Sequence, residues 1–254
     1  MRIHRSIPLL ALALLALPAA ARAQEPCPCP AEEEKPPEPA WKSKLGLAYL
    51  ATSGNSDTET VGLDLLVTRK PEPWGLEIYA RYDRAEDSGV ETSERALAGV
   101  RVKRSLGKRW ELFGETSAER DQYAGFDLRW LLAAGGTFHA VASERHELDF
   151  DLGLTWTDEN RLPPAEDVSY LGALAGLNWK WKLSERSSLR ERLVYYPNFD
   201  TSSDWRAESL TSLEAALTDR LALAVGYEIR YANEPIDDRE DTDTTTRVAL
   251  VLNF

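Results

Sequence analysis

Residues 146–156 read His-Glu-Leu-Asp-Phe-Asp-Leu-Gly-Leu-Thr-Trp. Every second position from Leu148 to Trp156 is apolar, and the positions between them are acidic residues, glycine or threonine. Side chains of a β-strand point alternately to its two faces, so this stretch predicts a strand with one apolar and one polar face. The same alternation recurs in residues 221–231 and 242–254. The chain from Trp41 onward is therefore predicted to be all β.

Twelve such segments follow one another to the C-terminus. We expect strands at 41–53, 58–69, 74–84, 93–104, 109–121, 126–138, 145–157, 168–182, 188–197, 205–217, 221–231 and 242–254. Most exceed the five or six residues of an average globular strand, and about 9 to 11 residues let a tilted strand cross a bilayer. The length and even number predict a closed antiparallel up-and-down transmembrane β-barrel of about 12 strands. A soluble antiparallel sandwich or barrel is the alternative.

The connections between these segments alternate in length. If both ends of the barrel chain are periplasmic, the odd-numbered connections face outward. Several of these are long, namely 86–91, 158–167, 198–204 and 232–241. The even-numbered ones are mostly tight, namely 70–73, 105–108, 184–186 and 218–220. This asymmetry is typical of outer-membrane barrels, and only the short first connection, 54–57, departs from it.

Aromatic residues gather at the expected strand ends, on the apolar face. The periplasmic set is Trp41, Trp74, Trp110, Phe138 and Trp181, followed by the terminal Phe254. The outer set is Tyr82, Phe126, Trp156, Trp205 and Tyr231. Aromatic rings prefer the two membrane–water interfaces, so the two sets predict two aromatic girdles.

The N-terminus has the features of an export signal. Arg2 and Arg5 precede the apolar stretch 7–17, and Ala21-Arg22-Ala23 fits a small-x-small cleavage pattern, which predicts a signal peptide over 1–23. Residues 24–40, QEPCPCPAEEEKPPEPA, are rich in proline and glutamate and predict an extended periplasmic tether, followed by the barrel domain over 41–254. Cys27 and Cys29 in this tether are either incidental thiols or partners in an intermolecular disulfide.

Composition excludes several classes of function. The 254 residues include 42 acidic and 30 basic side chains, and this net charge of -12 argues against nucleic acid as a partner. After the signal the histidines are His139 and His146, both expected at the periplasmic end, away from the serines of the outer rim. A nucleophile needs a base within about 3 Å, and a zinc site needs more ligands. We therefore expect no enzyme, no metal site and no cofactor.

The inward face carries a ladder of charged side chains grouped by strand. Basic Arg95, Arg101 and Lys103 are expected to pair with acidic Glu111, Glu115 and Glu119 on the next strand, since opposite charges on neighbouring strands attract. Acidic Asp149 and Asp151 likewise adjoin two basic strands that carry Lys180, Lys182, Arg190 and Arg192. Either the ladders interlock and occlude the lumen, or opposing charged walls line a narrow channel; twelve strands lie between self-filling and porous barrels.

A family resemblance rests on three stretches. Residues 46–65 read GLAYLATSGNSDTETVGLDL, residues 195–199 read YYPNF, and residues 227–254 read YEIRYANEPIDDREDTDTTTRVALVLNF. Together they resemble the YdiY-like family of salt-induced outer-membrane proteins, from about Trp41 to Phe254. The resemblance implies a barrel in the outer membrane, and Phe254 looks like the C-terminal aromatic signature that the assembly machinery reads. It carries no functional residues over.

These observations predict a non-enzymatic outer-membrane β-barrel linked to salt or envelope stress. It would be either a narrow channel for ions or small polar solutes, or an occluded structural barrel. The alternative is a surface adhesion or binding barrel that acts through its acidic outer loops, where Asp237, Asp238, Glu240 and Asp241 cluster. The expected partners are outer-membrane lipid, lipopolysaccharide and the assembly machinery, and the expected state is a monomer.

Overall fold

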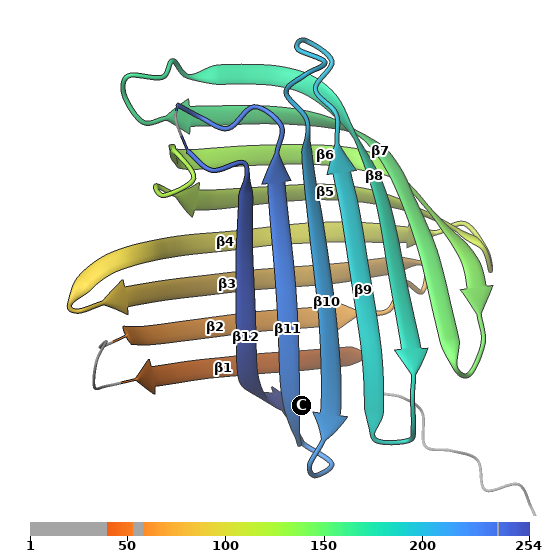
Figure 1. The fold of residues 1–254 in the computed structure, drawn as a ribbon. Helices are drawn as coiled ribbons and strands as arrows, with labels where there is room; N and C mark the ends of the chain where they lie inside the picture. The colour runs from red at the N-terminus through yellow and green to blue at the C-terminus, as the bar shows by residue number, and fades with distance from the viewer. Residues whose placement is uncertain (1–39, 53–57, 238) are drawn as a thin grey trace, which may run out of the picture. The chain divides into compact units, whose positions relative to one another are not determined.

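The computed structural model describes residues 40–52, 58–237 and 239–254, so the expected signal peptide and tether lie outside the described residues. The described chain forms twelve strands (Figure 1). They are β1 (Trp41–Thr52), β2 (Thr58–Arg69), β3 (Trp74–Asp87), β4 (Val90–Ser105), β5 (Trp110–Asp121), β6 (Phe126–Ala142), β7 (His146–Arg161), β8 (Val168–Lys182), β9 (Ser187–Tyr196), β10 (Arg206–Ala216), β11 (Leu221–Ala232) and β12 (Thr242–Asn253). None of the described residues belongs to a helix long and apolar enough to cross a membrane.

Each strand pairs antiparallel with the next, and β1 pairs with β12 to close the barrel. The closing register runs from Lys44 opposite Asn253 to Leu47 opposite Leu250. Backbone hydrogen bonds between Ser43 and Phe254, 2.7 and 3.0 Å long, extend this seam to the last residue. Closure leaves the sheet without a free edge, as a barrel in hydrocarbon requires. The predicted twelve-stranded antiparallel barrel is confirmed.

The outer hairpin formed by β3 and β4 extends further than the alternation predicted. β3 and β4 are joined by Ser88 and Gly89 alone, which have φ angles of 54° and 76°. Two consecutive positive φ angles are typical of the tight hairpin turn that matches strand twist. The long outer connection expected over 86–91 is therefore wrong, because polar residues there continue the strands.

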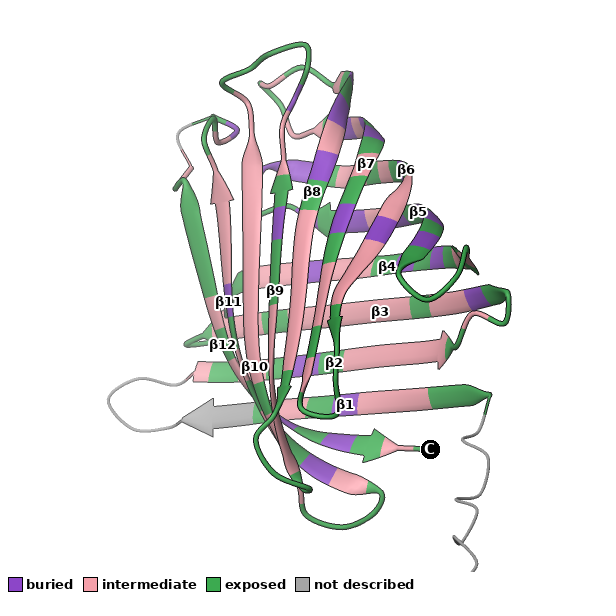
Figure 2. Ribbon diagram, turned by 90° about the vertical axis from the view of Figure 1, so that its right-hand side faces the viewer, coloured by how far each residue is buried: buried purple, intermediate pink, exposed green. Residues whose placement is uncertain are grey.

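Burial alternates along the strands, which fixes the two faces of the sheet. In β5 the buried positions include Glu111, Phe113, Glu115 and Glu119, while Leu112 on the other parity is 48% exposed. Figure 2 shows such buried bands on β5 to β8. Large apolar residues thus cover the outside, and the interior is mostly polar. Its apolar core is small and consists of Phe113, Ala133, Leu174 and Val194.

Phe126 departs from the predicted aromatic girdle. It is 1% exposed and lies inside, where the Arg129 guanidinium carbon sits 3.7 Å from its ring centroid. The register of β6 against β7 shifts between Phe126 and Leu128, and such a bulge inserts one residue and reverses the side-chain parity beyond it. Asp127 is consequently turned outward, with its side chain 54% exposed.

Candidate functional site

Ion pairs cross the lumen between strands that are not neighbours. Arg95 on β4 donates to Glu119 on β5 at 2.6 Å and to Glu228 on β11 at 3.0 Å. Arg81 on β3 reaches the other oxygen of Glu228 at 2.9 Å. Because β11 lies across the barrel from β3 and β4, the two contacts of Glu228 span the lumen, whereas Arg95 and Glu119 pair between the neighbouring strands β4 and β5.

A second layer of pairs lies nearer the outer mouth. Glu159 is 2% exposed and accepts hydrogen bonds from Arg129 at 2.5 Å and from Arg161 at 2.8 Å. Across the lumen, Arg230 on β11 contacts Asp121 on β5 at 2.7 Å. Buried ionised groups are stable only when they are paired and hydrogen-bonded, and both carboxylates meet this condition.

A third set of contacts joins further strands of the barrel. Arg101 lies 3.0 Å from Asp151 on β7 and 3.4 Å from Glu115, and its guanidinium carbon sits 3.8 Å from the Phe113 ring centroid. Lys44 on β1 contacts Glu214 on β10 at 2.6 Å. On β12, Arg247 reaches past β1 to Asp64 on β2 and Asp83 on β3. The lumen is crossed at several heights by charged side chains.

The structure brings together only part of the predicted ladder. Arg95 with Glu119 and Arg101 with Glu115 pair as expected. Lys103 does not contact Glu111: it pairs with Glu77 on β3 at 2.8 Å. Lys103 thus takes its partner from the strand on its other side, while Glu111 is near enough only for a longer-range attraction.

The predicted pairing of β7 acids with the basic strands β8 and β9 is also largely wrong. Asp149 contacts His139 at 2.7 Å and Asp151 contacts Arg101 and Thr137, all on β6 and β4. Glu147 does reach β8, where it contacts Lys180 at 2.8 Å, and Asp151 accepts a hydrogen bond from the neutral Asn178 of that strand at 3.3 Å. Arg190 and Arg192 have no carboxylate within 4.0 Å among the described residues. One inward wall therefore carries arginines without a direct ion pair among the described residues, although the more distant Glu208 and Glu115 attract Arg192.

The outer mouth is narrowed by the β11–β12 connection. Ile236 in this connection is 7% exposed and lies against Gly125 in the β5–β6 turn, where an added Cβ would come 2.8 Å from that of Ile236. Arg239 Nε donates to the carbonyl oxygen of Tyr123 at 2.9 Å. A recess of about 360 Å³ persists beside them, lined by both acidic and basic side chains.

The other predicted aromatic residues lie on the outer face. At one end, Trp41, Trp74 and Trp110 are about half exposed, and Trp110 packs on Phe138 with 4.8 Å between ring centroids. Beside them Trp181 stacks with His146 and with Trp179, a ring that the sequence analysis did not single out. At the opposite end Trp205 packs between Tyr195 and Tyr231, at 5.5 and 4.9 Å. Trp156 is 42% exposed, and the Tyr82 hydroxyl donates to Glu94.

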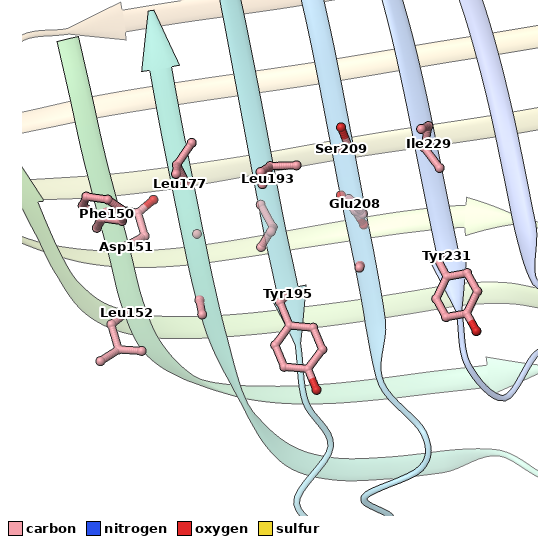
Figure 3. Close-up of a pocket in the computed structure, with 14 residues that line it drawn as sticks. Phe150, Asp151, Leu152, Leu177, Leu193, Tyr195, Glu208, Ser209, Ile229 and Tyr231 are labelled. Atoms are coloured by element: carbon pink, nitrogen blue, oxygen red, sulfur yellow. The ribbon is translucent and has the colours of Figure 1, made fainter.

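A shallow apolar groove of about 580 Å³ runs along the outer face of β7 to β11. Figure 3 shows Leu177, Leu193 and Ile229 along it, with Tyr195 and Tyr231 at one end. Beside this groove Glu191 points outward and accepts hydrogen bonds from Ser209 and Thr211, an outward carboxylate that the analysis of alternation did not identify. This face suits acyl chains, so the lumen is the better candidate for a polar solute.

Comparison with known proteins gives a family and a fold. The family described as "Protein of unknown function, DUF481" matches residues 45–254. The uncharacterized protein YdiY of Escherichia coli strain K12 is 24% identical over 211 residues, which cover 83% of this chain and 82% of that protein.

Two solved structures share the barrel. The NanC porin has a TM-score of 0.52 at 9% identity, with 84% of this chain and 98% of that chain covered. The COG4313 outer-membrane channel of Pseudomonas putida F1 has a TM-score of 0.52 at 15% identity, with 89% and 99% covered. At these identities the likeness establishes the fold of an outer-membrane barrel alone.

Proposed function

This chain belongs to the DUF481 family of proteins of unknown function, and we propose that it is a non-enzymatic outer-membrane barrel whose resting lumen is closed by ion pairs. We propose further that it reaches the outer membrane through a cleaved signal peptide over 1–23. The observation that carries the closed lumen is Arg95, which is 5% exposed and pairs with Glu119 on the neighbouring strand and with Glu228 across the barrel.

The energies of buried and exposed ion pairs support a closed lumen rather than a hydrated channel with charged walls. An exposed ion pair contributes about 0 to 1 kcal/mol, whereas removing one partner of a buried pair costs about 3 to 5 kcal/mol. Arg95, Glu119 and Glu228 are all buried, so a solute path along this level would require several such groups to lose partners together.

The link to salt stress belongs to the same proposal. Salt screens exposed charges over distances of about 3 to 10 Å, but buried pairs are screened much less. A lumen held shut by buried pairs would stay closed as external salt rises. This property suits an envelope component made under ionic stress.

A narrow channel is the second candidate, and Arg190 and Arg192 favour it. These inward arginines have no carboxylate within 4.0 Å among the described residues, so an opened lumen would attract anions. In this case the ion pairs would act as a gate instead of a permanent plug.

Planar-bilayer recording of the refolded barrel tests the proposal. Wild type is expected to show no conductance steps from low to molar salt, while the R95A/E228A double variant is expected to conduct. The matched control is R84A/E91A, which removes a 3.0 Å pair whose side chains are 45% and 33% exposed at the outer rim. Frequent steps with wild type would overturn the closed lumen and favour the channel.

A further inference from the structure

Two basic side chains face one another across neighbouring strands in the lumen. Lys180 on β8 is directly opposite Arg190 on β9 in the strand register, and Arg192 follows two residues further on the same face. Like charges directly opposite on a sheet are destabilising. Lys44 on β1 is close enough to both Lys180 and Arg190 to add Coulombic repulsion.

Acidic residues compensate only part of this charge. Lys180 contacts Glu147 at 2.8 Å and Lys44 contacts Glu214 at 2.6 Å. Among the described residues Arg190 has no such contact, and its Nε atom is buried without a hydrogen-bond partner. Arg192 has no direct ion pair either, but the more distant Glu208 and Glu115 attract it. The acids Asp149 and Asp151, which the sequence placed beside this wall, are instead engaged by His139 and Arg101.

Solvent reaches part of this basic group. Arg192 faces the lumen yet is exposed, so solvent reaches its side chain within the barrel. Lys180 and Arg190 lie close to the tight connection 183–186, at the end of the barrel opposite the layered ion pairs of Glu119 and Glu159. A ligand would therefore enter from this end, which is periplasmic in the proposed topology, without passing those pairs.

The geometry points to an anion-binding site formed by Lys180, Arg190 and Arg192, and we propose that it takes a phosphate or carboxylate group. Guanidinium groups bind such oxyanions through two parallel hydrogen bonds, and lysine adds a point charge. An anion here would supply the missing partner of Arg190 and relieve its repulsion with Lys180. Lipid phosphates outside the barrel cannot reach these inward side chains, so the ligand is a soluble periplasmic anion.

The test measures thermal unfolding of the refolded full barrel in detergent, with inorganic phosphate or acetate exchanged for chloride at constant ionic strength. A ligand that binds only the folded state raises the midpoint of unfolding. We expect wild type to respond to at least one of the two oxyanions. Comparing phosphate with acetate distinguishes the two ligand chemistries.

Variants separate binding from stability. R190Q/R192Q is expected to weaken oxyanion binding by about tenfold or more, because charge-assisted hydrogen bonds are lost. Without added oxyanion the single variant R190Q should unfold at a higher temperature than wild type, since the repulsion with Lys180 directly opposite is removed. R206Q removes an inward arginine at the outer end of β10 and should keep the wild-type response.

An equal midpoint shift in wild type and R190Q/R192Q, or no shift of wild type with either oxyanion, would overturn the proposal. The site does not depend on a closed lumen. If bilayer recording showed an open pore while the oxyanion response persisted, only the proposed closure would be wrong.

Discussion

Arg95 on β4 and Glu228 on β11 form a 3.0 Å ion pair across the lumen, although 133 residues separate them in sequence. Both side chains are buried, and each has a second partner of opposite charge: Glu119 for Arg95 and Arg81 for Glu228. The cluster therefore joins β3, β4, β5 and β11. Such a connection ties opposite walls of the barrel together.

This pair predicts strong energetic coupling. R95A alone should cost about 3 to 5 kcal/mol, because Glu228 and Glu119 lose a buried partner. The R95A/E228A double change should cost less than the sum of the single changes, and the difference is the coupling energy. Denaturant unfolding of the four proteins in lipid vesicles measures it. Additive costs within about 0.5 kcal/mol would mean hydrated, independent walls.

The sequence predicted the strands, and through parity it placed most charges on the inward face. Alternation is a local property, so it identifies faces from residues such as Leu148 and Asp149 without knowledge of the fold. It cannot identify the partner of Arg95 on β11, because that contact depends on how the closed barrel brings its opposite walls together. Lys103 illustrates the same limit: it pairs with Glu77 on β3, and alternation does not show which of the two neighbouring strands supplies the partner.

The bulge in β6 escaped prediction for a different reason. Phe126 has the same parity as the outward residues of β6, such as Trp130, and nothing in a period-two pattern marks an inserted residue. The contact between Arg129 and the buried Phe126 ring exists only because the register shifts. Local irregularities of this kind depend on neighbouring strands and not on residue type.

The two faces of β7 give a prediction on topology. Phe150 is 43% exposed on the outer face, whereas Asp151 is 8% exposed and paired inside. F150R should cost about 2 to 4 kcal/mol near the bilayer midplane, since a charge would enter hydrocarbon. Single spin labels at positions 150 and 151 should report lipid and lumen respectively. The same environment at both positions would contradict the assigned parity.

The backbones of β6 and β7 approach closely at Gly135, so we expect a larger side chain there to destabilise the barrel. A Cβ added there would lie 2.2 Å from the carbonyl oxygen of Leu152 and 2.6 Å from the Cα of Gly153 on β7. G135A should therefore lower the free energy of unfolding by about 1 to 3 kcal/mol or more, because the two strands must separate. G114A on β5 is the control, since no heavy atom lies within 4 Å of its added Cβ. Equal unfolding midpoints for the two variants would contradict this close packing.

Phe254 gives a prediction on assembly. Its backbone closes the barrel against Ser43 through hydrogen bonds of 2.7 and 3.0 Å, while its side chain is 67% exposed and packs little. Deleting Phe254 removes two peripheral hydrogen bonds, each worth about 0.5 to 1.5 kcal/mol, so a barrel already folded should lose little stability. The family resemblance implies that the assembly machinery reads the terminal aromatic ring, so the amount of folded barrel in the outer membrane should fall several-fold. Heat-modifiable mobility of membrane fractions measures that amount, and refolding of purified protein measures stability.

The variant F254Y keeps both the backbone and an aromatic ring and should assemble as wild type does. Normal amounts of folded barrel after deletion would show that Phe254 is dispensable for assembly.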